Sequence, residues 1–159
     1  MKNDTVVLGL GNPLMSDEGI GVCLVQKLAQ QAGRFSGVAF IDAGTGGISL
    51  LYHIEGRKKA VIIDCARMGT EPGTIRRFTP EQVRSVKIPA HQSLHEADFL
   101  KIIDMAKSLG QCPKEIVIYG IEPQSVQPGA ELSRLLTERI EQYVSVIAGE
   151  LTGRENLPD

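Results

Sequence analysis

The feature that most constrains the fold is an apolar run that passes through two glycines into a helical pattern, in VVLGLGNPLMSDEGIGV at residues 6–22. The run at 5–10 is rich in β-branched residues and has no polar alternation, which is typical of a strand buried on both faces. From Glu18 to about Gly33, apolar residues recur at helical spacing, which predicts a helix with one apolar stripe. A strand buried on both faces and followed by such a helix indicates a sheet covered by helices.

The same alternation continues along the chain and predicts the rest of the fold. Strands are predicted at 38–42, 59–64, 73–78 and 115–121, and helices at 47–56, 96–109 and 130–149. The segment 73–78 follows Pro72-Gly73 and alternates weakly, so we expect an antiparallel or edge strand there. We therefore predict an α/β fold of three layers, in which helices cover both faces of a mostly parallel, twisted five-stranded sheet with one antiparallel strand.

Length and composition bound the class of protein. The 159 residues suit one domain, placed at 1–150, and the unpatterned tail at 151–159 is predicted to be frayed. With 17 basic and 19 acidic side chains and no basic block, the chain is not expected to bind nucleic acid. No run approaches the roughly 18 apolar residues of a membrane span, so no membrane insertion is expected. Three scattered cysteines and no signal-peptide layout predict a cytoplasmic protein with reduced thiols.

The loop after the first predicted strand does not fit a nucleotide site. A dinucleotide fingerprint needs a third glycine where Leu14 stands, and Pro13 removes a backbone donor. Asp17 and Glu18 at the helix start would also repel a phosphate. One interpretation of the two acids is structural: Ser16 or Asp17 caps the helix, and Glu18 interacts with the helix dipole. The other is that they belong to a functional site, and this loop alone does not decide between the two.

Acids also end other predicted strands. Asp42 ends the second predicted strand and Asp64 ends the third, where a solvent-facing acid would stand at the mouth of a site. Open α/β sheets place their sites at this carboxyl edge. An acid after a strand is more often a turn former than a ligand, so Asp64 keeps both interpretations.

Histidines supply a third kind of candidate ligand. His91 and His95 lie in PAHQSLHEADFL, with His95 at the predicted start of a helix behind Ser93. A lone histidine is usually structural, and His53, inside a helical pattern, is interpreted as a surface or packing residue. Glu, Asp and His from separate strand ends would form an O,O,N set for a first-row divalent metal and leave coordination positions open. Spacing alone does not establish that these side chains converge.

Several segments together resemble the hydrogenase maturation proteases, endopeptidases that remove the C-terminal extension of the large subunit of nickel-iron hydrogenases. The segments are LGLGNPLMSDEGIGV, DAGTGGISLL, VIIDCARMG, SLHEADFLKIIDMA and IYGIEPQ. They occur in order from Val6 to the last predicted helix, and their combination is specific although each alone is weak. The resemblance implies a hydrolase of the aspartyl-protease kind on an α/β fold with a five-stranded sheet. It also implies no permanent cofactor, because the nickel is supplied by the substrate.

The resemblance further implies which residues contact that nickel. Glu18 and Asp64 match the acids of the family's motifs, and His95 matches its histidine, with His91 as the alternative. Candidates for positioning the substrate are Asp17, Asp42, Gly44 and Thr45. The implied partner is a nickel-loaded hydrogenase large-subunit precursor, on which the protein is expected to act as a monomer.

Two other functions remain open from the sequence. One is a nickel-dependent chaperone that binds the precursor without cleaving it, which composition does not exclude. The other is a peptidyl-tRNA hydrolase, a family that also begins with a strand leading into Gly-Leu-Gly-Asn-Pro. That family then expects a Tyr and a Thr-Arg-His-Asn segment, where this chain has LMSDEGIGVCLV and no histidine.

Overall fold

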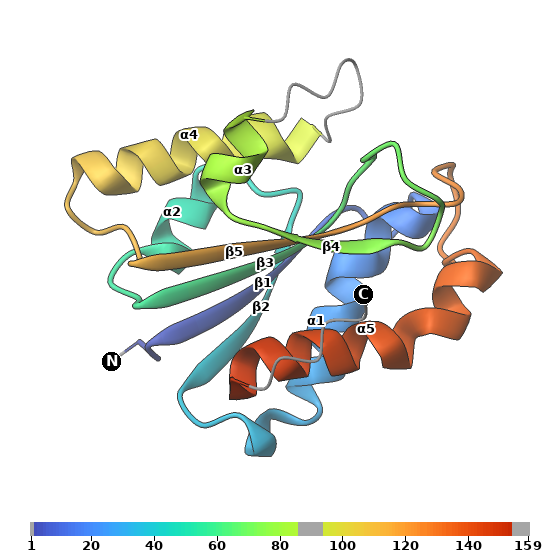
Figure 1. Cartoon of the computed structure of the whole chain (residues 1–159), viewed down its shortest axis with the longest axis horizontal. Helices are drawn as coiled ribbons and strands as arrows, with labels where there is room; N and C mark the ends of the chain where they lie inside the picture. The colour runs from blue at the N-terminus through green and yellow to red at the C-terminus, as the bar shows by residue number, and fades with distance from the viewer. Residues whose placement is uncertain (1, 86–93, 154–159) are drawn as a thin grey trace.

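The fold is a five-stranded sheet in the strand order β2-β1-β3-β5-β4, seen in a computed structural model that describes residues 2–85 and 94–153 (Figure 1). The strands are β1 (Thr5–Leu10), β2 (Val38–Gly44), β3 (Lys59–Cys65), β4 (Ile75–Phe78) and β5 (Glu115–Ile121). The pairs formed by β1, β2, β3 and β5 are parallel, and β4 is antiparallel to β5. The predicted mixed sheet with one antiparallel strand is therefore confirmed.

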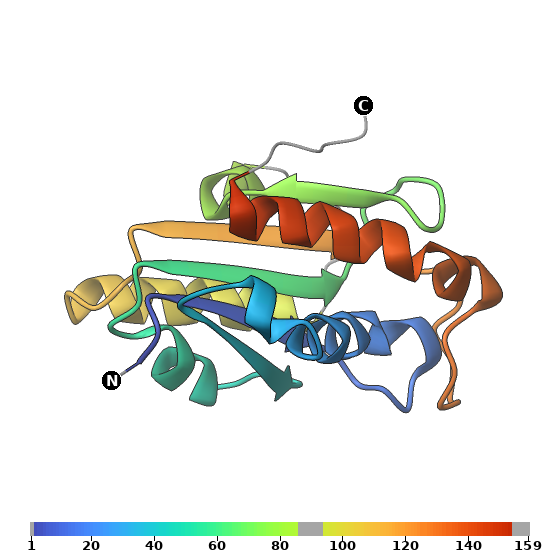
Figure 2. The ribbon, with the colours of Figure 1, turned by 90° about the horizontal axis from the view of Figure 1, so that it is seen from below.

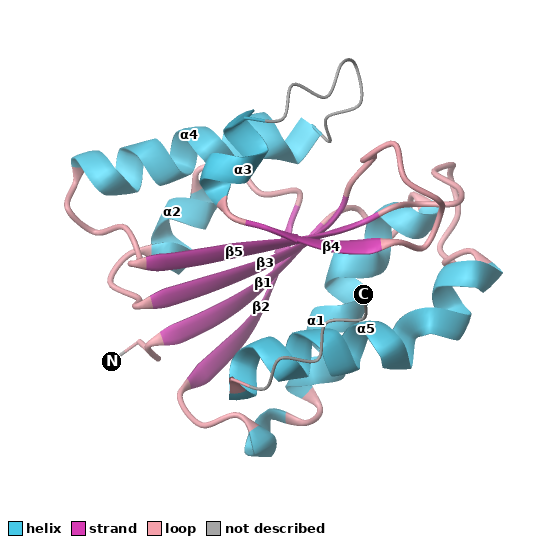
Figure 3. Ribbon diagram, viewed as in Figure 1, coloured by secondary structure: helices cyan, strands magenta, loops and turns pink. Residues whose placement is uncertain are grey.

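Helices cover both faces of this sheet. The α-helices are α1 (Ile20–Ala29), α2 (Ser49–Ile54), α3 (Pro80–Ser85), α4 (Leu94–Ser108) and α5 (Arg134–Thr152), and two short 3-10 helices are η1 (Ser16–Gly19) and η2 (Ala32–Arg34). Helices α1 and α5 lie on one face, and α2 and α4 lie on the other (Figures 2 and 3). Within the described residues, no helix is long and apolar enough to cross a bilayer.

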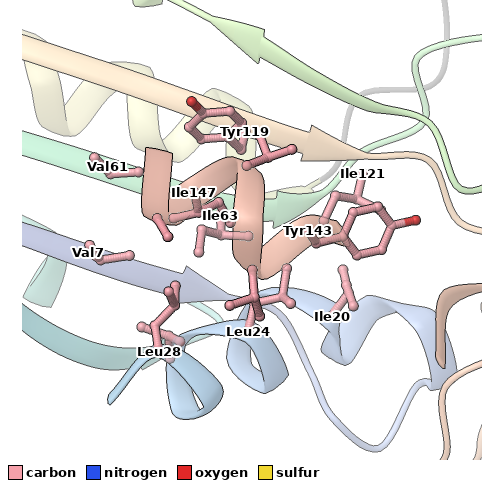
Figure 4. Packing of buried hydrophobic residues seen from close by; sticks show 14 of the residues in the cluster. Val7, Ile20, Leu24, Leu28, Val61, Ile63, Tyr119, Ile121, Tyr143 and Ile147 are labelled. Atoms are coloured by element: carbon pink, nitrogen blue, oxygen red, sulfur yellow. The ribbon is translucent and has the colours of Figure 1, made fainter. Parts of the chain in front are cut away.

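The sheet separates two apolar cores, which explains why its central strands are apolar without alternation. Along β3, Val61 and Ile63 pack with α1 and α5, whereas Ala60 and Ile62 pack with α2 and α4. The first core also contains Tyr143 of α5, which is fully buried and donates a hydrogen bond of 2.6 Å to the carbonyl of Gly73 (Figure 4). Both faces of a parallel strand bury apolar side chains in this arrangement.

Some predicted boundaries are wrong. The helix expected from Glu18 begins at Ile20, because Ser16–Gly19 forms the separate 3-10 turn η1. Helix α3 was not predicted from the sequence at all. Helix α5 continues to Thr152, two residues into the tail that was expected to be frayed, because Leu151 packs against the first core. It ends at Gly153 in the left-handed conformation with φ 72°, and residues 154–159 lie outside the described residues.

Candidate functional site

The glycines of the opening loop allow close packing of backbone against backbone. Gly11 has φ 130°, and a Cβ atom there would stand 1.9 Å from the carbonyl oxygen of Glu18. A Cβ atom on Gly21 would stand 2.3 Å from the carbonyl oxygen of Ile63. Only glycine tolerates both positions, so η1 and the start of α1 are held directly against the carboxyl ends of β1 and β3. The acid-bearing turn thus lies at the edge where a site was expected.

Asp17 is the most buried of these acids, with a side chain that is 0% exposed. Its Oδ2 accepts hydrogen bonds of 2.9 Å from the backbone N–H groups of Gln124 and Ser125, and its Oδ1 accepts one of 2.7 Å from Ser133. All three donors belong to the loop of residues 122–133, called the α5 loop below. Asp17 therefore fastens the α5 loop to the turn that carries Glu18.

The helix-capping interpretation of this turn is wrong. The N-cap residues are Met15 for η1 and Gly19 for α1, and neither makes a side-chain capping hydrogen bond. The hydroxyl of Ser16 instead donates a hydrogen bond of 2.8 Å to the carbonyl of Gln127. The side chains of Ser16 and Asp17 form hydrogen bonds with backbone groups of the α5 loop, because that loop lies beside the turn in the folded chain.

Asp64 is the second-to-last residue of β3, so its predicted place at the end of this strand is confirmed, but its side chain is buried. It belongs to β3, is paired in register with Gly120 of β5, and is only 4% exposed, so it is not the solvent-facing acid expected. It lines a small, mostly apolar pocket of about 20 Å³ together with Ile62 and Phe99. The structure therefore places Asp64 in the wall of a pocket between the sheet and α4, near the carboxyl edge.

Asp17, Glu18 and Asp64 all lie near enough to the thiol of Cys65 for their charges to affect its pKa. Burial raises the pKa of the Cys65 thiol, and the charges of Asp64, Asp17 and Glu18 raise that pKa further. Arg67 acts in the opposite sense on the same pKa. Because only a thiolate is a strong nucleophile, Cys65 stays a protonated, inert thiol. The functional groups offered by this region are therefore carboxylates, and Cys65 is not an activated nucleophile.

The preferred histidine candidate, His95, lies at the start of α4. His95 is the second residue of α4, and its position is one helical turn before Phe99, which lines the Asp64 pocket. His91, the Ser93 cap and the side chain of His95 lie outside the described residues. The described side chains form no group of three His, Cys, Asp or Glu residues that would hold a metal ion. His53 in α2 packs edge-on against Tyr52, which agrees with the predicted packing role.

The second loop at this edge is built around Asp42. Asp42 lies within β2, which continues to Gly44 and bulges there, since Gly9 pairs with Asp42 but Leu10 pairs with Gly44. The exposed carboxylate of Asp42 accepts a hydrogen bond of 2.9 Å from the N–H of Gly44. Gly44 has φ 56°, and its carbonyl accepts a hydrogen bond of 2.7 Å from Gly11, so this turn is tied to the β1 loop. Thr45 follows on the exposed side of the same turn.

One buried acid was missed by the sequence reasoning. Glu122 directly follows β5 and is 6% exposed. Its Oε1 accepts hydrogen bonds from the N–H of Met68, the N–H of Thr70 and the hydroxyl of Thr70, at 2.8, 2.9 and 3.0 Å. The signal was present, because Glu122 ends a buried strand just as Asp64 was thought to do. It fixes the loop between β3 and β4 against the end of β5.

The chain is similar to proteins of one family. The family model for hydrogenase maturation proteases matches residues 22–150. The hydrogenase 2 maturation protease of Escherichia coli is 32% identical over 159 residues, which cover 96% of this chain and 94% of that protein. The hydrogenase expression/formation protein HoxM of Cupriavidus necator is 31% identical over 140 residues, which cover 87% of this chain and 69% of HoxM.

The fold is also similar to that of solved structures. The hydrogenase maturating endopeptidase HybD from E. coli superimposes with a TM-score of 0.81 at 28% identity. The superposition covers 96% of this chain and 93% of HybD. The sequence comparisons and the structural comparison therefore indicate the same family.

Proposed function

The chain belongs to the hydrogenase maturation proteases, a family of peptidases, and on this premise we propose that it removes the C-terminal extension of a nickel-iron hydrogenase large-subunit precursor after nickel insertion. The nickel in this proposal belongs to the substrate, and the protease has no permanent cofactor. Its partner is the nickel-loaded precursor, on which it acts as a monomer in the cytoplasm.

The observation that supports the proposal is that two acids lie on elements that pack against each other at one edge of the sheet. Glu18 is half-buried on η1, and Asp64 is buried on β3, against which η1 packs. Carboxylate oxygens suit first-row divalent metals, and an imidazole adds a nitrogen ligand that nickel binds well. His95, at the start of α4, is proposed to be that third ligand, with His91 as the alternative.

By contacting the nickel held in the precursor, the protease would distinguish precursor that contains nickel from precursor that does not. A nickel ion with open coordination positions would accept Glu18, Asp64 and His95 as additional ligands. A nickel-free precursor has no metal ion with which these three side chains could interact. Metal loading then becomes the condition for cleavage. The burial of Asp64 supports this role, since a carboxylate in an apolar pocket gains most from a cation brought to it.

Peptide hydrolysis needs a polarised carbonyl and an activated water. In the proposed reaction, the substrate nickel polarises the carbonyl, and one of the two carboxylates takes a proton from the attacking water. The water oxygen bonds to the carbonyl carbon, the C–N bond breaks, and the proton passes to the leaving nitrogen. Cys65 takes no part, because its buried thiol keeps a raised pKa.

The experiment is incubation of the purified protein with nickel-loaded and nickel-free precursor, followed by mass spectrometry of the precursor. We expect loss of the C-terminal extension only from the nickel-loaded form. Glu18→Gln, Asp64→Asn and His95→Ala should each lower the rate by about 100-fold or more, the scale of a lost acid–base group. Glu138→Gln, an exposed acid on α5, is the matched control and should cleave at the normal rate.

The outcomes separate this proposal from its rivals. Cleavage at normal rate by all three site variants would show that the site is elsewhere. An unchanged precursor mass together with a stable, nickel-dependent complex would instead identify a chaperone that binds without cutting.

A further inference from the structure

A polar cleft opens beside the proposed site, at the carboxyl edge of β3 and β5. It has a volume of about 200 Å³, and two loops line it: the β3–β4 loop with Arg67, Gly69 and Thr70, and the α5 loop from Glu122 to Val126. Arg67 stands three residues after Asp64 in the chain. On the other wall, the backbone of Gln124 and Ser125 is hydrogen-bonded to Asp17, the neighbour of Glu18. The cleft is therefore next to the segments that carry Asp64 and Glu18.

Buried carboxylates fasten both walls of this cleft. Glu122 accepts three hydrogen bonds from Met68 and Thr70, which fix the wall that carries Arg67. Asp17 fixes the opposite wall through Gln124 and Ser125. Hydrogen bonds to ionised groups are among the strong ones, so the cleft is preformed. A preformed cleft binds a peptide at a lower entropic cost than a flexible loop does.

Arg67 is the exposed charged group of the cleft, because the lining acid Glu122 is buried. Arg67 is exposed, is the one cation among the lining residues, and makes no ion pair within the described part of the chain. Glu122, the lining acid, is already engaged by three donors through Oε1. A guanidinium presents a planar fork of N–H donors that matches a carboxylate with two parallel hydrogen bonds. An acidic group is the ligand that this cleft fits.

We propose that this cleft, called the Arg67 cleft, binds an acidic side chain of the precursor segment next to the cleaved bond, and that Arg67 selects for negative charge there. The inference rests on the proposed protease function and deepens it. The occupant is a peptide and not a free anion, because the cleft adjoins the carboxylate site and because Gln124 and Ser125 add neutral polar groups along its wall. Without Arg67, the gathered acids Glu18, Asp64 and Asp17 would repel such a segment.

The test measures precursor binding and cleavage separately. Binding of nickel-loaded precursor to the full-length protein is followed by titration calorimetry in the Glu18→Gln variant, in which cleavage is expected to be about 100-fold slower or more. Both proteins of each comparison carry this change, so the loss of Glu18 affects them equally. In that background, Arg67→Glu is expected to weaken binding at least tenfold. In the cleaving protein, Arg67→Glu is expected to raise KM by a similar factor and to leave kcat within about twofold. Lys27→Glu, an exposed cation in the last turn of α1, makes the same charge change away from the cleft and should alter neither value.

A charge swap then identifies the partner group. Acidic residues of the precursor near the cut are changed to Lys one at a time, and one of these variants should bind Arg67→Glu better than it binds the protein with Arg67. Unchanged binding and KM for Arg67→Glu would overturn the inference while leaving the protease function intact. Arg67-dependent binding of a precursor that is never cleaved would overturn the protease function and keep the cleft. An effect equal to that of Lys27→Glu would mean that only net charge matters, which would also overturn it.

Discussion

The carboxylate of Asp17 accepts a hydrogen bond of 2.7 Å from the backbone N–H of Ser133, the residue that caps α5 through its own hydroxyl. A single buried side chain thus joins the turn that carries Glu18 to the start of the last helix. The two residues are 116 positions apart in the chain. Through this contact, Asp17 can fix the position of Glu18 without contacting the substrate itself.

Asp17→Asn is expected to destabilise the protein. An amide has one oxygen in place of two carboxylate oxygens, so at least one of the three buried N–H donors loses its acceptor. A buried, unsatisfied donor costs roughly 1–3 kcal/mol, and loss of the charge weakens the remaining bonds, so we expect about 2–4 kcal/mol in urea denaturation. Asp4→Asn removes only an exposed pair with Lys58 and should change the unfolding free energy by less than about 0.5 kcal/mol. Equal effects of the two changes would contradict this role.

Gly21→Ala is expected to destabilise the protein although alanine favours helices. The added Cβ would stand 2.3 Å from the carbonyl oxygen of Ile63 and 2.5 Å from that of Leu10, and both are backbone atoms of buried strands. Helix propensity favours alanine by about 1 kcal/mol, whereas overpacking costs roughly 1–3 kcal/mol and more where, as here, backbone atoms cannot move aside, so the clash decides the sign. Gly33→Ala, which meets nothing within 4 Å, is the matched control and should be neutral or slightly stabilising in thermal unfolding.

The stability of the fold is expected to depend on pH through the carboxyl group of Glu150. Burial opposes its ionisation, but hydrogen bonds from Arg77, Lys59 and Tyr119 lower the pKa of the Glu150 carboxyl to about 2. A lowered pKa in the folded state stabilises the fold above the unfolded value of about 4.3, and this stabilisation is lost as pH falls from there through about 2. It amounts to at most about 3 kcal/mol.

Denaturation of Glu150→Gln from pH 6 to pH 2 checks this prediction. The variant should be less stable than the parent at pH 6, and the difference should shrink as the pH approaches 2. Glu138→Gln, which removes an exposed pair with Arg134, should show a small difference that depends little on pH. A constant difference for Glu150→Gln across this range would rule out the proposed ionisation.

Cys65 is expected to resist alkylation in the folded protein. Its side chain is 6% exposed and its pKa is raised by burial and by neighbouring carboxylates, whereas Cys23 and Cys112 are partly exposed. With iodoacetamide at pH 8, mass spectrometry should find Cys65 modified last, and quickly only after urea is added. Prompt modification of native Cys65 would mean that the carboxylate site is more open than this structure shows.

Much of the fold could be predicted because burial leaves a local periodicity in the sequence. The run at 59–64 is apolar on both faces of β3, and the stripe that includes Tyr143 faces the first core from α5. The antiparallel strand β4 was predicted from Pro72-Gly73 and weak alternation. Helix α3 was missed because a single six-residue helix offers too few positions for a period.

The candidate site was only partly predictable for the same physical reason. The sequence and its resemblance to a known family picked out Glu18 and Asp64, and the carboxyl-edge rule indicated where such residues would lie. The burial of the Asp64 side chain was not predicted, since the sequence does not distinguish a strand-end acid that faces solvent from one that is buried. The assignment of His95 as a nickel ligand stays a prediction.

The sequence by itself determined the layers, the strand elements and the glycine turn, because each depends on neighbours a few residues apart. Tertiary structure alone decided what Asp17 and Glu122 do, because all but one of their hydrogen-bond donors are backbone N–H groups, and these lie 52 to 116 residues away in the chain. Every residue except proline carries the same backbone N–H donor, so the sequence does not indicate which of these donors will form a hydrogen bond with a buried carboxylate. Only the folded chain brings those groups together, and with them the two walls of the cleft beside Glu18 and Asp64.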